Sequence, residues 1–120
     1  MDVRDLEEFF APAGRVEARR MFGGVGVFAD GLMVALQAGG VVYLKVDGES
    51  EPAFLAEGLE PFSYVAKGVT KSLGYRRLPD AAYDDPDAMR IWFGLALSAA
   101  RRKAAARPAR KPKRRSARDI

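Results

Sequence analysis

The first residues of the chain place apolar side chains at the spacing of a helix. Val3, Leu6 and Phe10 follow this period, and acidic residues fill most of the positions between them. The pattern predicts a helix over about residues 3–11. The Ala-Pro-Ala-Gly stretch that follows ends it, because proline and glycine both discourage helical continuation.

Between Val16 and Val46 the apolar positions change to the pattern of strands. Asp30-Gly31 and Gly39-Gly40 each separate two apolar runs, which is the strongest short-range signal for a hairpin. Three consecutive antiparallel strands are expected, over about residues 16–29, 32–37 and 41–46.

The middle of the chain predicts a short helix and a second hairpin. Ser50 is suited to the N-cap of this helix, and Gly58 to its end. The two strands that follow are rich in aromatic and β-branched residues. They are expected over about residues 62–66 and 70–78.

The last helix has the clearest signals. Asp85 is suited to its N-cap and Pro86 to its first position. One amphipathic face then recurs at helical spacing and must lie on the sheet. This face consists of Met89, Trp92, Phe93, Ala96 and Ala100. The alanine-rich end carries the helix to about Ala106, before Pro108 stops it.

These elements, in the order α-β-β-β-α-β-β-α, predict an α/β protein of the α+β type. We expect two layers, with an antiparallel sheet and the helices packed on one of its faces. Residues 1–100 form the folded domain. Residues 107–120 combine dense positive charge with two prolines and no apolar periodicity, so a disordered basic tail is expected there.

Composition narrows the classes of protein. No run of 18 apolar residues exists, and the acidic start lacks the basic and apolar regions of a signal peptide. Cysteine is absent, which excludes disulfides, thiolate catalysis and zinc–thiolate sites. We expect a cytoplasmic protein with no membrane partner.

Three closely spaced glycines, Gly23, Gly24 and Gly26, raise the question of a phosphate-binding loop. Such a loop joins a strand to a helix, whereas here a strand and a hairpin turn follow, and Ala29 stands where a third glycine is needed. The structural alternative is a bulge or bend within one long strand, or a close approach of backbones. We favour the structural interpretation.

Little in the sequence suits catalysis. Histidine is absent, and no serine stands in a nucleophile motif. The acidic cluster of Asp84, Asp85 and Asp87 lacks the spacing of a calcium loop and is explained by helix capping. We therefore expect no enzyme, no catalytic or metal-ligating residue and no cofactor.

Charge divides the chain into two parts. Residues 101–120 have a net charge of +9, whereas residues 1–100 have −5. A flexible basic segment suits non-specific contact with phosphate backbones, although a merely solubilising terminus fits equally well. The candidate nucleic-acid-binding residues are Arg101, Arg102, Lys103, Arg107, Arg110, Lys111, Lys113, Arg114, Arg115 and Arg118.

The strand 32–37 is apolar on both faces, since all residues from Leu32 to Leu36 are apolar. The predicted helices cover only one face well. The other face is then buried in a homodimer or under a partner, although a central strand covered on both sides gives the same pattern.

Four stretches together resemble a known family: "RRMFGGVGVFADGLMVAL", "VYLKVDGES", "GLEPFSY" and "DDPDAMRIWFGLAL". They are similar to the N-terminal domain of the TfoX/Sxy proteins, bacterial regulators of competence for DNA transformation, over about residues 4–100. The resemblance implies a fold similar to secretion chaperones, with the glycines bending the long first strand. Its structural signature comprises Met21, Phe22, Gly23, Gly24, Gly26, Asp30 and Gly31.

The resemblance also implies a function. Family members act without known catalysis, and the best-known ones work with a cyclic-AMP-responsive activator at competence promoters. They carry a second, C-terminal domain, where this sequence has its basic tail. We expect a non-enzymatic regulatory domain that contacts a transcription factor or other protein, with DNA affinity from the tail.

Two alternatives remain open at this point. The first is a dimeric module resembling a secretion chaperone, which holds a peptide and has no role on DNA. The second is a small metal-dependent enzyme built on the acidic cluster.

Overall fold

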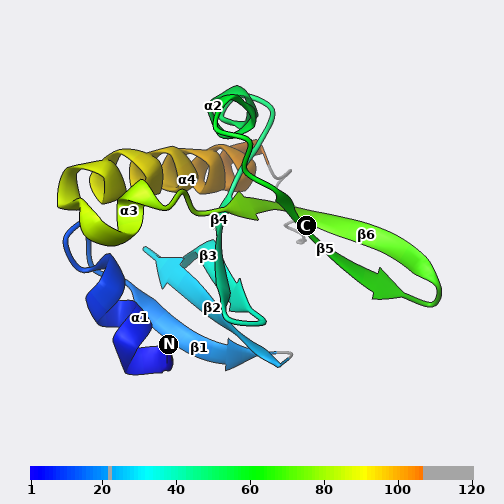
Figure 1. The fold of residues 1–120 in the computed structure, drawn as a ribbon, viewed down its shortest axis with the longest axis horizontal. Coiled ribbons are helices and arrows are strands. Elements are labelled where there is room, and N and C mark those ends of the chain that lie inside the picture. Colours follow the sequence, from blue (N-terminus) through cyan, green and yellow to red (C-terminus); the bar gives the residue numbers. More distant parts are fainter. Residues whose placement is uncertain (22, 107–120) are drawn as a thin grey trace, which may run out of the picture.

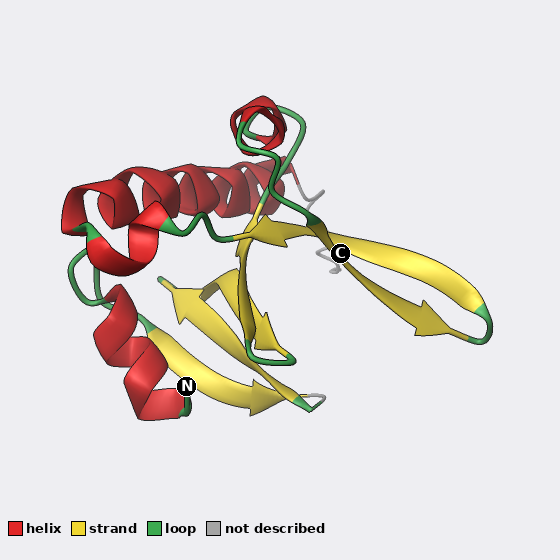
Figure 2. Ribbon diagram, viewed as in Figure 1, coloured by secondary structure: helices red, strands yellow, loops and turns green. Residues whose placement is uncertain are grey.

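The computed structural model describes residues 1–21 and 23–106, apart from the side chains of residues 71–73. Within these residues the strands form one antiparallel sheet of six strands in the order β1-β2-β3-β4-β6-β5. The helices α1 and α4 cover one face of it (Figures 1 and 2). The strands are β1 (Glu17–Met21), β2 (Gly24–Ala29), β3 (Leu32–Ala38), β4 (Val41–Lys45), β5 (Pro61–Ala66) and β6 (Val69–Arg77). The helices are α1 (Val3–Phe10), α2 (Glu51–Ala56), α3 (Ala81–Asp84) and α4 (Pro86–Ala106).

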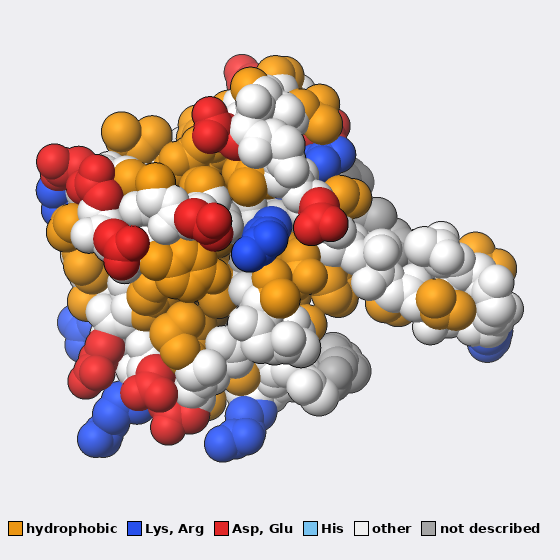
Figure 3. Space-filling view, viewed as in Figure 1, with side chains coloured by type: hydrophobic (Ala, Val, Ile, Leu, Met, Phe, Trp, Pro, Cys, Tyr) orange, Lys and Arg blue, Asp and Glu red, His pale blue; other side chains and the backbone are white. Residues whose placement is uncertain are grey.

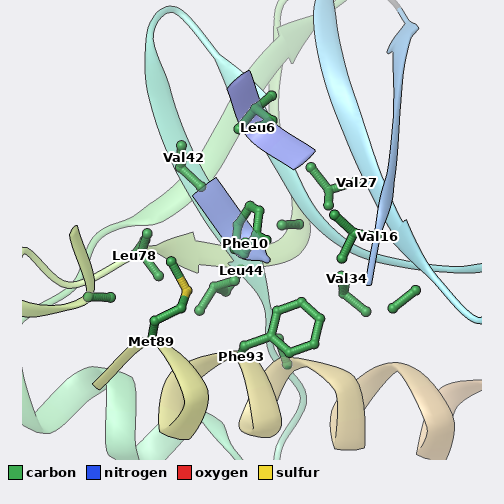
Figure 4. Close-up of a cluster of buried hydrophobic side chains, with 14 of the residues drawn as sticks. Leu6, Phe10, Val16, Val27, Val34, Val42, Leu44, Leu78, Met89 and Phe93 are labelled. Carbon is green, nitrogen blue, oxygen red and sulfur yellow. The ribbon is translucent and has the colours of Figure 1, made fainter. Parts of the chain in front are cut away.

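The hydrophobic core lies between the sheet and the helices α1 and α4 (Figure 4). Phe93 of α4 meets Phe10 of α1, with their ring centroids 5.8 Å apart. Val34 of β3 and Leu44 of β4 belong to the same cluster, and both are fully buried. The expected two-layer α+β arrangement, with the helices on one face, is therefore confirmed.

The turn predictions are confirmed by backbone geometry. At Asp30-Gly31 and at Gly39-Gly40 both residues have positive φ, between 53° and 78°. This is the conformation of a two-residue type I′ hairpin, which glycine and aspartate adopt most readily. Lys67 and Gly68 adopt it as well, with φ of 54° and 77°, between β5 and β6.

The expected single strand over residues 16–29, bent at the glycines, is wrong. The chain reverses instead, so β1 and β2 pair antiparallel and Met21 lies opposite Gly24. Gly23 has a φ of 78°, which suits a turn better than a strand bend. The first hairpin adds one strand to the predicted order, and the short helix α3 was also missed.

The close approach of backbones that glycine suggests is present at Gly24. A Cβ atom placed there would lie 2.4 Å from the carbonyl oxygen of Gln37 on β3. Because that atom belongs to the backbone of a paired strand, no rotamer change can relieve the contact. Any side chain at Gly24 must therefore push β2 and β3 apart.

The starts of α1 and α4 follow the capping rules, whereas the residues before α2 and α3 make no side-chain cap. Asp85 accepts a hydrogen bond from the backbone N–H of Asp87 at 2.9 Å, as expected for the start of α4. Ser50 stands before α2, but its side chain does not cap that helix. Its hydroxyl instead accepts from the N–H of Asp47 at 3.0 Å, so it orders the loop between β4 and α2.

None of the described helices is long and apolar enough to cross a lipid bilayer. The expected basic tail, residues 107–120, lies outside the described residues.

Candidate functional site

The face of the sheet away from the helices carries an apolar groove of about 330 Å³, here called the open-face groove. Its floor includes Leu36 of β3, which pairs with Gly26 on one side and Tyr43 on the other. The full lining is Met21, Gly23, Gly24, Val25, Gly26, Met33, Leu36, Gln37, Ala38, Lys45, Phe62, Tyr75 and Lys103. The volume lies at the lower end of the range for small-molecule sites.

The glycine signature builds one side of the open-face groove. A Cβ atom at Gly26 would lie 2.5 Å from Sδ of Met21 and 3.3 Å from Cε of Met33. The missing side chain at Gly26 therefore makes room for these two thioether side chains over β2. Methionine is flexible and polarisable, and such residues form adaptable apolar walls. The signature residues thus shape the fold and the groove together.

Aromatic side chains form the opposite side. Phe62 of β5 meets Tyr43 of β4 edge-on, at 5.1 Å between ring centroids, and stacks with Tyr64 at 6.2 Å. Tyr75 of β6 is buried, and this burial raises the pKa of its phenol to about 12. Tyr75 is therefore a neutral part of the wall at ordinary pH.

Two lysines stand at this aromatic end. Lys45 of β4 is only 7% exposed, and its ammonium lies 5.0 Å from the ring centroid of Tyr75. Lys103 reaches the groove from the last turns of α4. Burial, followed by repulsion from Lys103, lowers the pKa of Lys45 to about 8. Neither lysine forms a salt bridge within the part of the chain that the structure describes.

The nearby acid is held by an arginine. Arg102 donates two hydrogen bonds to the carboxylate of Asp47, at 2.7 and 2.9 Å, and also pairs with Glu49 at 2.7 Å. The guanidinium of Arg102 holds the pKa of Asp47 well below its usual range. This ion pair fixes the end of α4 to the loop after β4, and so sets the position of Lys103.

The candidate nucleic-acid-binding residues thus divide into two groups. Arg101 pairs with Asp30 at 3.0 Å, Arg102 pairs with Asp47, and Lys103 faces the groove. These contacts are structural, and nothing in them tests binding to DNA. The other candidates, Arg107, Arg110, Lys111, Lys113, Arg114, Arg115 and Arg118, lie outside the described residues.

The remaining signature and cluster residues have plain structural positions. Asp30 and Gly31 form the turn between β2 and β3, while Phe22 lies outside the described residues. In the acidic cluster, Asp87 pairs with Arg90, and Asp85 caps α4. Among the residues that the structure describes, no group of three acidic side chains is arranged to hold a metal ion.

Sequence reasoning missed the pair of lysines. The available signal was Lys45 itself, a charged residue within an apolar strand. Its neighbour in space, Lys103, belongs to a different element, so the sequence alone does not pair the two. The apolar outer face of β3 was recognised, and Met33 and Leu36 place it in the groove. Whether a second copy covers this face stays a prediction.

We predict that replacement of Lys45 by methionine changes the pH dependence of stability. A lowered pKa means that the folded protein holds the Lys45 proton less tightly than the unfolded chain, whose lysine titrates near 10.5. The free energy of unfolding of the wild type should therefore rise from about pH 8 to pH 10 relative to that of Lys45→Met. Urea denaturation at several pH values measures this difference.

The groups that face Lys45 are Lys103 from α4, Asp47 after β4 and Tyr75 on β6. Tyr75 titrates near pH 12, above the window, and Asp47 far below it. Parallel curves for the two proteins would show that the Lys45 ammonium is not disfavoured in the fold.

Comparison with known proteins identifies the family. The family model described as the TfoX N-terminal domain matches residues 8–100. The chain is also similar to the DNA transformation protein TfoX1 of Aliivibrio fischeri (strain ATCC 700601 / ES114), with 34% identity over 79 residues. That match covers 62% of this chain but only 38% of the relative, so the chain spans well under half of that protein. The chain belongs to the TfoX family through its N-terminal domain.

Proposed function

We propose that this chain is a non-enzymatic regulatory domain that acts in DNA transformation by contacting a protein partner, such as a transcription factor. Its membership of the TfoX family and its similarity to a DNA transformation protein support the proposed role in this process. One structural observation supports the mode of action: an arm of the sheet carries apolar side chains far from the core.

This arm is the hairpin of β5 and β6, here called the β5–β6 arm, which projects from the body of the domain (Figures 1 and 3). Near its tip, Val65 is 70% exposed and Val69 is 56% exposed. β5 is also an edge strand, so its outer backbone groups are free to pair with another chain. Apolar side chains beside an open strand edge suit a protein contact.

We predict that the double substitution Val65→Asp and Val69→Asp reduces transformation at least tenfold in cells whose own copy of the gene is deleted. The melting temperature of the variant protein should stay close to that of the wild type, since neither valine side chain contributes to the core. Ile91→Asp is the matched control, because Ile91 is 65% exposed on α4. Normal transformation by the arm variant, or by the deletion strain itself, contradicts the proposal.

The residues after α4 supply the second part of the proposal, a non-specific affinity for DNA. Because α4 extends to Ala106 and its Arg102 pairs with Asp47, a truncation at residue 100 would shorten the helix and remove this ion pair. The proper boundary is Ala106. Seven of the candidate cations follow it, from Arg107 to Arg118.

We predict that the full chain binds duplex DNA with a steep salt dependence, and that residues 1–106 do not. If all seven cations met phosphates, the slope of log K against log salt would approach about −6. Fluorescence anisotropy at several salt concentrations measures it. Equal binding by the truncated chain, or no binding by the full chain at low salt, refutes the DNA part alone.

The alternative, a peptide-holding module without a role on DNA, is favoured by one observation, the open-face groove. In that case the groove, and not the β5–β6 arm, makes the essential contact. The arm variant described above separates the two proposals, since it leaves the groove unchanged.

A further inference from the structure

We propose that the open-face groove binds a small carboxylate with an apolar body, and that its carboxylate lies between the ammonium groups of Lys45 and Lys103. This site goes beyond the proposed regulatory function and does not depend on it. The argument rests on the shape of the groove, its two separate ends and its unbalanced charge.

The apolar end offers a wall for a hydrocarbon body. Met21 and Met33 lie over Gly26, and Leu36 forms the floor. Leu36 is almost fully buried although it stands outside the core cluster of the domain. The groove is thus a second apolar surface on the sheet, outside the core cluster, and the last turns of α4 lie against its lysine end.

The other end has positive charge, and in residues 1–21 and 23–106 no acidic side chain forms a salt bridge with it. Lys45 is almost fully buried, and Lys103 from another element lies close enough to repel it. Among the described residues, the only carboxylate with a resolved influence on Lys45 is that of Asp47, which is held by two hydrogen bonds from Arg102. A buried cation without a paired anion is unfavourable, and a bound anion would remove this cost.

The size and the charge of the site select the ligand class. About 330 Å³ suits a small molecule better than a folded partner. A nucleic-acid phosphodiester has no apolar body for the methionine side. A phosphate dianion would lose more hydration than a carboxylate on entering beside Lys45 and the buried ring of Tyr75. A monocarboxylate with a hydrocarbon or aromatic body fits both ends.

The test is an NMR titration of the full ¹⁵N-labelled chain with decanoate as the probe and decanol as its neutral counterpart. Decanoate should shift the amides around Gly26, Leu36 and Lys45, and decanol should bind at least about tenfold more weakly. Lys45→Met and Lys103→Met should each weaken decanoate binding about tenfold. Lys67→Met is the matched control, since Lys67 is exposed in the turn of the β5–β6 arm, and it should bind as the wild type does.

A second readout separates ion pairing from simple apolar adsorption. Since Lys45 is partly deprotonated near pH 8.5, binding of an anion should draw a proton onto it. Calorimetry at pH 8.5 in two buffers of different ionisation enthalpy should therefore show proton uptake with the wild type. Lys45→Met should show none.

Several outcomes overturn the proposal. They are an absence of decanoate binding, binding of decanol as tight as that of decanoate, or an equal loss of decanoate affinity in all three lysine variants. An acetylated tetrapeptide ending in leucine is titrated in parallel, and tighter binding of that peptide than of decanoate overturns the assignment to a small molecule. If Lys45→Met fails to fold, Lys103→Met decides the result, because Lys103 is exposed on a helix.

Discussion

The α4 helix packs on the sheet along one buried face, which consists of Met89, Phe93, Ala96 and Ala100. All four are buried, and the small alanines let the helix lie close to β3 and β4 while Phe93 reaches Phe10. The α1 helix completes this layer. Because both long helices lie on one face, the hydrophobic core is confined to that face, and the position of every other feature follows from it.

The length of α4 links the core to the opposite face. Its first turns fill the core, and its last turns carry Arg102 to Asp47 and Lys103 to the groove. The ion pair of Arg102 therefore has two effects. It anchors the helix end, and it occupies the carboxylate that would otherwise balance Lys45. The same pairing leaves the groove positive in a domain that is acidic as a whole.

Local patterns were sufficient for most of the fold. The turns at Asp30-Gly31 and Gly39-Gly40 need only the positive φ that these residues accept, and the start of α4 needs only Asp85 and Pro86. The glycines at 23–26 were not decisive, because a bulge in one strand and a turn between two strands have the same local signature. Only the antiparallel pairing of β1 with β2, which places Met21 opposite Gly24, distinguishes the two.

The site was less predictable for the same reason. Lys45 and Lys103 are 58 residues apart, and so their approach depends on the packing of α4 and not on any motif. Arg102 appeared in the sequence as one cation among ten, although the fold assigns it to Asp47. The apolar outer face of β3 could be predicted from the uninterrupted apolar run in the sequence, whereas the presence of two cations beside it could not.

The central claim is that the core lies on the helix-covered face, so that the groove face is free for a ligand or partner. Val34 and Met33 are neighbours on β3, with Val34 in the core and Met33 in the groove wall. Urea denaturation of Val34→Thr and Met33→Gln tests the claim directly. The account predicts that Val34→Thr lowers the free energy of unfolding by about 1–3 kcal/mol, because the threonine hydroxyl would be buried among apolar side chains without a hydrogen-bond partner. Met33→Gln should lower it by less than Val34→Thr does, because the Met33 side chain is only partly buried and lies in the groove wall. An equal loss in the two variants would contradict the account.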